Sequence, residues 1–184
     1  METFTRLLIA TLTCIIAKTQ AEPPKSIPKR ADISVSGIFL EDPASTEKVL
    51  GKEIPHEEQL AYWNKDRTQL LTLLFHGGDT VHAFAEFKVT QADKNESAIK
   101  VLSLPAFITG KGVRLGITQK QLTEIFGQGV EERVGRQSIV HYKIEDIALA
   151  SSPFLQHYRM PSYYGEYHFE GGKLVEFRFG FELP

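Results

Sequence analysis

Histidines come closest to the residue types and spacing of a metal site. His76 and His82 flank a glycine-containing turn, and Asp79 lies between them. In a hairpin with a three-residue loop, His76 pairs with Thr80 and His82 with Leu74. Both imidazoles then share one face of the sheet, with Cβ atoms within about 7 Å of each other. Two imidazoles and a carboxylate can hold zinc, but a solvated hairpin end without a further inner ligand is more typical of a polar surface. We predict no metal site and no cofactor.

A catalytic centre finds little support among the remaining residues. His168 is predicted to face Glu176 in a C-terminal hairpin, an arrangement more typical of a cross-strand pair than of a general base and its orienting acid. The chain has no nucleophile elbow, no phosphate-binding loop and no His-Glu-x-x-His motif. Its single cysteine, Cys14, lies in an apolar stretch near the N-terminus. We therefore predict that the protein is not an enzyme.

Aromatic residues are the best candidates for contact with a partner. Tyr62 and Trp63 lie between the predicted helix and hairpin of the N-terminal half, and Tyr163 and Tyr164 lie in the corresponding region of the C-terminal half. Tyrosine and tryptophan combine a large contact area with a polar tip and are enriched in protein interfaces. We predict that these four residues bind a partner. The alternative, that they cover the edge of the core, stays open.

The composition limits the partners. The chain has 184 residues, a formal charge of −2 and 42% hydrophobic residues, which suits one globular unit or two small units that share a core. No basic stripe is present to neutralise phosphates, and nucleic acid is therefore not expected as a partner. The oligomeric state is not indicated by the sequence.

The N-terminus has the pattern of a secretory signal peptide. Arg6 precedes an apolar run from Leu7 to Ala17, and after Lys18-Thr19-Gln20 comes the small residue Ala21. A helix over this run would span only about 16 Å, roughly half of the bilayer core, so no stable membrane insertion is expected. We predict a signal peptide over residues 1–21, cleaved near Ala21, a linker over 22–31, and a periplasmic or secreted protein.

Two segments, 37–51 and 112–127, share a layout that predicts a short helix in each half. Asp42 is a good N-cap before Pro43, and Thr118 begins a capping box with Gln121. A glycine ends each predicted helix, at Gly51 and Gly127. These patterns predict helices that start and stop at corresponding places in the two halves.

Two glycine-turn hairpins follow the helices in the same order. Residues 75–81, Phe-His-Gly-Gly-Asp-Thr-Val, match residues 169–175, Phe-Glu-Gly-Gly-Lys-Leu-Val. With a three-residue loop, Phe169 faces Val175 and Tyr167 faces Phe177 on the apolar side. Phe177 and Phe179 are then predicted to point inward. The matching pairs predict an internal duplication, with a first α/β repeat over 32–106 and a second over 107–184.

The second repeat resembles a known family. Residues 113–118, Val-Arg-Leu-Gly-Ile-Thr, followed by Gln121, Leu122 and Ile125–Gly127, are similar to the helix-opening signature of the small-protein-A/outer-membrane-lipoprotein-A group. A tandem pair of such units is similar to the β-lactamase inhibitory protein fold. The resemblance implies helices on one face of an antiparallel sheet and an open concave face for a protein partner. The lipid-attachment cysteine that the lipoprotein branch carries after its signal is missing.

The predicted fold class is therefore α+β, with two tandem copies of a short helix and an antiparallel sheet and with the helices packed on one face. We expect an exported, non-enzymatic binding module that engages a protein partner through the sheet face or the inter-repeat aromatics. The alternative is a periplasmic carrier of a small ligand, with a pocket between the repeats.

Overall fold

The structure, a computed structural model, describes residues 27–55, 57, 59–75, 81–92, 97–145 and 152–182. The predicted signal peptide, residues 1–21, and the first part of the predicted linker lie outside these residues. In the described ranges no helix is both long and apolar enough to cross a membrane.

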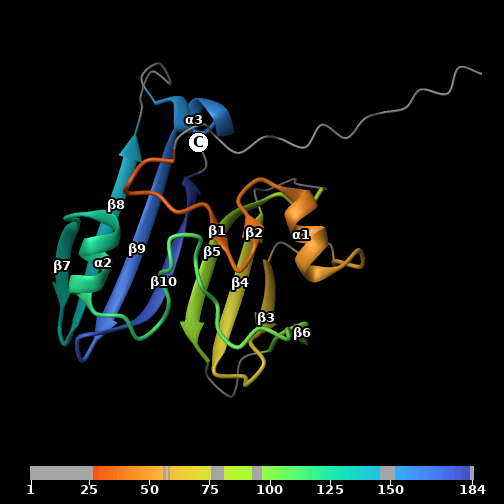
Figure 1. Cartoon of the computed structure of the whole chain (residues 1–184), viewed down its shortest axis with the longest axis horizontal. Helices are drawn as coiled ribbons and strands as arrows, with labels where there is room; N and C mark the ends of the chain where they lie inside the picture. Colours follow the sequence, from red (N-terminus) through yellow and green to blue (C-terminus); the bar gives the residue numbers. More distant parts are fainter. Residues whose placement is uncertain are drawn as a thin grey trace, which may run out of the picture.

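Strands dominate the described part of the chain (Figure 1). In chain order the elements are β1 (Ser34–Val35), β2 (Ile38–Phe39), α1 (Pro43–Leu50), β3 (Gln59–Trp63), β4 (Gln69–Phe75), β5 (Phe84–Gln91), β6 (Lys100–Val101), α2 (Gln119–Phe126), β7 (Val130–Val134), β8 (Gln137–Glu145), α3 (Pro153–Tyr158), β9 (Ser162–Glu170) and β10 (Lys173–Glu182). The fold is a mixed one, with a large sheet and few helices.

The large sheet has eight strands in the order β6-β3-β4-β5-β10-β9-β8-β7. All neighbours are antiparallel except β3 and β6, which are parallel. The strands β3 to β5 form one meander and β7 to β10 form another. The last long strands of the two meanders, β5 and β10, pair at the centre, where Phe87 lies opposite Phe179 and Val89 opposite Phe177. The two halves of the chain thus share one continuous sheet.

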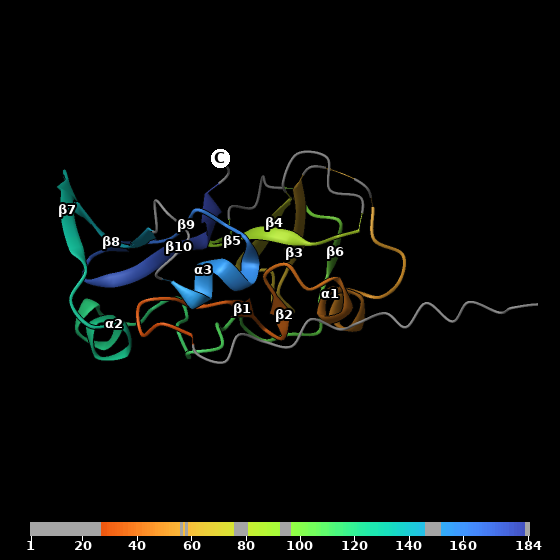
Figure 2. The same cartoon turned by 90° about the horizontal axis from the view of Figure 1, so that it is seen from above.

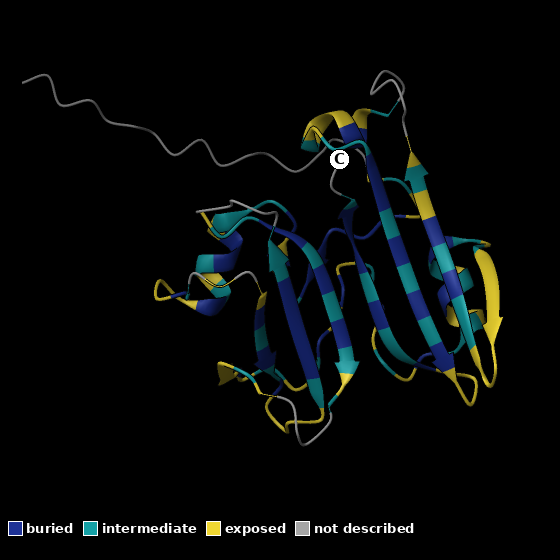
Figure 3. Ribbon diagram, turned by 180° about the vertical axis from the view of Figure 1, so that it is seen from behind, coloured by how far each residue is buried: buried dark blue, intermediate teal, exposed yellow. Residues whose placement is uncertain are grey.

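The three helices of the described residues and the small β1-β2 sheet lie on one side of the large sheet (Figure 2). One hydrophobic cluster fills the space between these layers and draws on both halves, from Leu60 and Phe87 to Leu122 and Phe177. Phe177 and Phe179 are fully buried, as predicted. The opposite side of the sheet carries no helix of the described chain (Figures 2 and 3).

The helix ends form as the sequence predicts. Asp42 caps α1 by accepting hydrogen bonds from the backbone N–H groups of Ala44 and Ser45, and Thr118 forms a complete capping box with Gln121. Gly51 and Gly127 end the two helices. Both glycines have φ values near +90°, a region that is open to glycine at low cost. Local side-chain chemistry is enough to fix these boundaries.

The C-terminal hairpin differs from the prediction only at its tip. Lys173 pairs with Glu170 around a two-residue turn, so Phe169 lies opposite Leu174 instead of Val175. A bulge between Leu174 and Glu176 then shifts the register by one residue, and beyond it Tyr167 lies opposite Phe177 as predicted. The bulge compensates for the shorter turn and keeps the apolar residues on one face.

The predicted register of the N-terminal hairpin is wrong. The three-residue loop that pairs His76 with Thr80 would also place Phe75 opposite Val81 and Leu73 opposite Ala83. In the structure Leu73 pairs with Phe87, and Phe75 pairs with Phe84. The connection between β4 and β5 is longer than three residues, and a register shift follows at its start. Phe84 consequently faces the core side, where its ring stacks on Phe75 with the centroids 4.4 Å apart.

The end of the predicted linker 22–31 is packed against the protein. Ala31 is buried, and the Lys111 ammonium donates hydrogen bonds to the carbonyls of Pro28 and Lys29. The N–H of Asp32 donates to the Tyr163 hydroxyl at 2.9 Å. Residues 28–31 therefore belong to the folded unit and join the N-terminal segment to the C-terminal half.

Candidate functional site

The side of the sheet opposite the helices forms the candidate site, which we call the open face (Figure 3). Strand registers align its outward residues into rows that cross several strands. One row contains Ala61, Thr72, Lys88, Arg178, Glu166, His141 and Val130. The next row contains Gln59, Leu74, Glu86, Gly180, Tyr164 and Lys143. Apolar residues dominate the β3-β4 side of this face, and charged residues dominate the side formed by β5, β10, β9 and β8.

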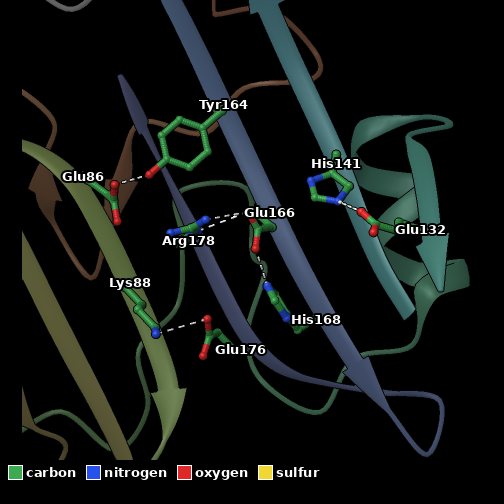
Figure 4. A network of polar contacts seen from close by, with 9 residues as sticks. All are labelled: Glu86, Lys88, Glu132, His141, Tyr164, Glu166, His168, Glu176 and Arg178. Atoms are coloured by element: carbon green, nitrogen blue, oxygen red, sulfur yellow. Dashed lines mark hydrogen bonds and ion pairs between the residues drawn. The ribbon is translucent and has the colours of Figure 1, made fainter. Parts of the chain in front are cut away.

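Glu166 is the centre of a polar network on β9 (Figure 4). Its Oε2 accepts hydrogen bonds from Nη2 of Arg178 at 2.8 Å and from Nε at 3.2 Å. Its Oε1 lies 2.5 Å from Nε2 of His168, two residues along the same strand. Both carboxylate oxygens are therefore engaged by neighbouring side chains.

This environment shifts the pKa values of Glu166 and Arg178. Burial by itself would raise the pKa of Glu166, but the hydrogen bonds and charges of Arg178 and His168 together hold it below its usual value of 4.5. The hydrogen bond to Glu166 raises the pKa of Arg178 in turn. The network thus fixes a cationic guanidinium on the open face beside a carboxylate that stays ionised well into the acidic range.

Tyr164 links this network to β5. Its hydroxyl hydrogen-bonds Glu86, and the Arg178 guanidinium lies 5.7 Å from the centroid of its ring. Burial raises the Tyr164 pKa far above its usual value, and the Glu86 carboxylate raises it further. The strands approach closely beside this pair because Gly180 has no side chain. A Cβ on Gly180 would lie 2.2 Å from the carbonyl oxygen of Ala85.

A groove of about 530 Å³ runs over this region. Its walls come from both halves of the chain: Leu74, Phe75, Ala85 and Glu86 on one side, and His141, Lys143, Tyr164, Glu166, Arg178 and Glu182 among those on the other. The groove is open to solvent, and its walls combine charged side chains with apolar ones such as Leu74, Phe75 and Phe181.

Further ion pairs surround the groove. Lys88 lies 3.2 Å from Glu176 across β5 and β10, and Lys143 lies 2.6 Å from Glu145 and 3.2 Å from Glu182. Each pair is partly exposed, and exposed pairs contribute little to stability. Their effect is to hold charges of both signs at defined positions on the open face.

The four predicted partner-binding residues fall on two faces. Tyr62 and Tyr163 are 1% and 0% exposed in the core, so they cannot touch a partner in this conformation, and their assignment to binding is wrong. Burial raises the Tyr62 pKa to about 12. Trp63 directly follows Tyr62, and Tyr164 directly follows Tyr163. Both of these second residues are half-buried and lie on the open face. The alternation of a strand separates each pair of neighbours.

The predicted histidine pair is only partly described. His76 and Asp79 lie outside the described residues, while the Nε2 of His82 lies 3.3 Å from the Pro55 carbonyl oxygen. Within the described ranges no group of three histidine, cysteine or acidic residues is arranged to hold a metal. His168 does lie opposite Glu176, but its ring contacts Glu166, and Glu176 pairs with Lys88.

Sequence reasoning missed Glu86, His141 and Lys143 as members of this surface. The alternation along β9 was available, because Tyr164, Glu166 and His168 are every second residue and point away from the apolar set. The sequence does not show that residues of β5 and β8 lie beside this row, because their placement depends on long-range strand pairing.

Comparison with known proteins gives no relative. No family model matches the chain, and no curated protein or solved structure matches it either.

Proposed function

We propose that this protein is an exported, non-enzymatic binding module that engages a protein partner through the open face of its sheet. The observation that carries the proposal is the contrast between the two sides of one sheet. One side is covered by all the described helices, and the other presents an ordered network around Glu166, Arg178 and Tyr164. Uncovered, chemically mixed faces of this kind are typical of interaction surfaces.

The extent of the face favours a partner of protein size. Trp63 lies on β3 and Tyr164 on β9, four strand spacings apart in the sheet. At about 4.8 Å per spacing, the two aromatics are separated by roughly 19 Å across the strands alone. A single small molecule does not span this distance, whereas a protein interface of about 800 Å² per partner does.

The composition of the face also fits a protein interface. Arginine, tyrosine and tryptophan are the residue types that most often dominate binding energy. Arg178 and Tyr164 are held in place by Glu166 and Glu86 before any partner arrives. Because these side chains lose little freedom on binding, they are efficient anchors.

A small-ligand carrier is the second candidate. The groove of about 530 Å³ lies at the junction of the two halves and is within the usual size range of ligand pockets. Its charged walls would suit a polar ligand with groups of both signs. Its openness to solvent favours the protein partner.

An affinity measurement separates the two candidates. Proteins captured by the wild-type protein would be identified and their affinities compared with those of Trp63→Ala and Tyr164→Ala variants. We expect each substitution to weaken binding of the partner by more than tenfold, about 1.4 kcal/mol, with unchanged circular dichroism and melting point. Loss of affinity at Tyr164 alone would favour a ligand confined to the groove, and unchanged affinity in both would refute the proposal.

We also propose that the two halves arose by duplication, which agrees with the family resemblance. Glu41 and Gly116 precede α1 and α2 at corresponding places, and both have a left-handed backbone. The N–H of Glu41 donates to the carbonyl of Phe84 on β5, and that of Gly116 donates to the carbonyl of Leu174 on β10. Each half thus ties the turn before its helix to its own central strand. The extra strand β7 and helix α3 are additions in the second half.

A further inference from the structure

The strand β7 leaves one edge of the large sheet unpaired. Of the described strands only β8 pairs with it, and all five of its residues are exposed (Figures 1 and 3). Val130 is 72% and Val134 53% exposed, both among the larger exposed apolar side chains of the described chain. The opposite edge ends in β6, which has only two residues. An edge of this length with apolar side chains is a template for strand addition.

The hairpin geometry shows which backbone groups of β7 are available. Val134 pairs with Gln137 around a two-residue turn. The residues that flank such a turn exchange hydrogen bonds, and the pattern alternates along the strand. Val134, Glu132 and Val130 therefore use their backbone groups toward β8. The N–H and C=O groups of Glu131 and Arg133 point away from β8, outward from the free edge and in the plane of the sheet.

We propose that this edge binds a second copy of the same chain by antiparallel β7-β7 pairing. The sequence of β7, Val-Glu-Glu-Arg-Val, is self-complementary in one register. When Glu131 lies opposite Arg133 of the second copy, the two-fold symmetry also places Arg133 opposite Glu131 of the second copy. Each of these two pairs exchanges N–H···O=C bonds in both directions. Val130 then lies opposite Val134 of the second copy, and this apolar pair also occurs twice.

Charge selects this register over its neighbours. A shift that keeps the outward backbone groups matched puts Glu131 opposite Glu131, or Arg133 opposite Arg133. Like charges directly opposite on a sheet are unfavourable, and opposite charges are favourable. Charges on edge strands commonly prevent association, but here their signs favour one arrangement. In the single chain, the Nε of Arg133 already lies 3.0 Å from Oε1 of Glu131. Each side chain therefore moves only a short way to pair with its counterpart in the second copy.

One like-charge contact remains. Glu132 lies opposite itself at the two-fold axis, and in each chain its Oε2 is 3.5 Å from Nε2 of His141. This contact weakens the pairing. In addition, a pair of five-residue edges buries less than the roughly 800 Å² per partner of a stable complex. The dimer is consequently weak and reversible. The symmetry axis is perpendicular to the sheet, so the two open faces lie on the same side and form one longer surface.

Sedimentation velocity tests the proposal by charge exchange. The protein and its variants would be purified in the form that the cell accumulates and measured up to about 1 mM, a range that detects complexes near −4 kcal/mol. We expect the wild type to form dimers reversibly. Glu131→Arg and Arg133→Glu should each weaken the dimer at least tenfold, because each creates two like-charge pairs.

Two restored combinations serve as controls. The double variant with both substitutions and the equimolar mixture of the two single variants should regain dimers, because opposite charges again face each other. Glu132→Gln should strengthen the dimer. A wild type that stays monomeric throughout the range would overturn the proposal. A dimer unaffected by the single substitutions, or not regained in the mixture, would do so as well.

A disulfide reports the register independently of affinity. In a background with Cys14→Ser, Glu132→Cys should crosslink the two copies on mild oxidation, because residue 132 lies opposite itself. Arg133→Cys is the matched control and should crosslink far less, since its own counterpart lies two residues along the strand. Equal crosslinking at both positions would overturn the register.

Discussion

Tyr163 and Tyr164 are neighbours in the chain and lie on opposite faces of β9. The Tyr163 hydroxyl is buried and accepts the N–H of Asp32 at 2.9 Å, whereas the Tyr164 hydroxyl binds Glu86 on the open face. The first contact attaches the N-terminal segment to the core. The second belongs to the surface that we assign to binding. Two identical residue types therefore have different roles because of strand alternation.

The two hydroxyls should differ in their effect on stability. Tyr163→Phe leaves the buried N–H of Asp32 without an acceptor, which should lower the free energy of unfolding by about 1–3 kcal/mol. Tyr164→Phe removes a hydrogen bond at a half-exposed site and should cost less than about 1 kcal/mol. Denaturant unfolding of both variants measures the difference. A larger loss for Tyr164→Phe would contradict the assignment of the two faces.

Gly180 should be intolerant of a side chain. An added Cβ would lie 2.2 Å from the Ala85 carbonyl oxygen and 2.7 Å from the Glu86 Cα. Gly180→Ala therefore forces β5 and β10 apart and should destabilise the protein by about 1–3 kcal/mol, the usual cost of overpacking. Glu176→Ala, on the same strand and face, is the matched control. Equal thermal midpoints for Gly180→Ala and the wild type would show that the two strands are not in such close contact.

Stability should fall in acid partly because of Glu166. Its pKa is lower in the folded protein than its usual value of 4.5, so the unfolded chain binds the proton more tightly. The contribution of Glu166 to the free energy of unfolding is complete above pH 4.5. It is lost as the pH falls through the lowered pKa of the folded protein. Chemical unfolding from about pH 3 to pH 7 should therefore show a weaker pH dependence in Glu166→Gln. Identical pH profiles would mean that the network does not hold this carboxylate ionised.

The sequence and the structure agree where local chemistry decides. The caps at Asp42 and Thr118 and the inward placement of Phe177 depend on nearby residues, and each could be predicted. Strand alternation could also have placed Tyr163, because counting back by twos from Phe169 and Tyr167 reaches it. This alternation places Tyr163 in the core, contrary to its predicted role in binding.

Long-range pairing explains the remaining differences. The register of β4 and β5 depends on a connection longer than the glycine turn suggests and on a shift beside Phe84. The groove depends on β5 meeting β10, whose residues are about ninety positions apart in the chain. No local pattern encodes that contact. Glu86 on β5 and His141 on β8 could therefore not be assigned to the site from the sequence.

Export should be visible in the mass of the protein. The apolar run between Arg6 and Ala21 is typical of a cleaved signal. Intact-mass measurement of the periplasmic or secreted protein should give a chain that begins just after Ala21. A species that keeps Met1, or one that carries a diacylglycerol group, would contradict this expectation.

Site-specific photo-crosslinking in the producing cells tests the open face most directly. A photoreactive residue would replace Trp63 or Lys88 on the open face, or Lys120 on α2 as the control on the opposite side. We predict that the open-face positions crosslink to the same partner protein and that the Lys120 position does not. Crosslinking of a protein from Lys120 but not from Trp63 or Lys88 would contradict the assignment of binding to the open face.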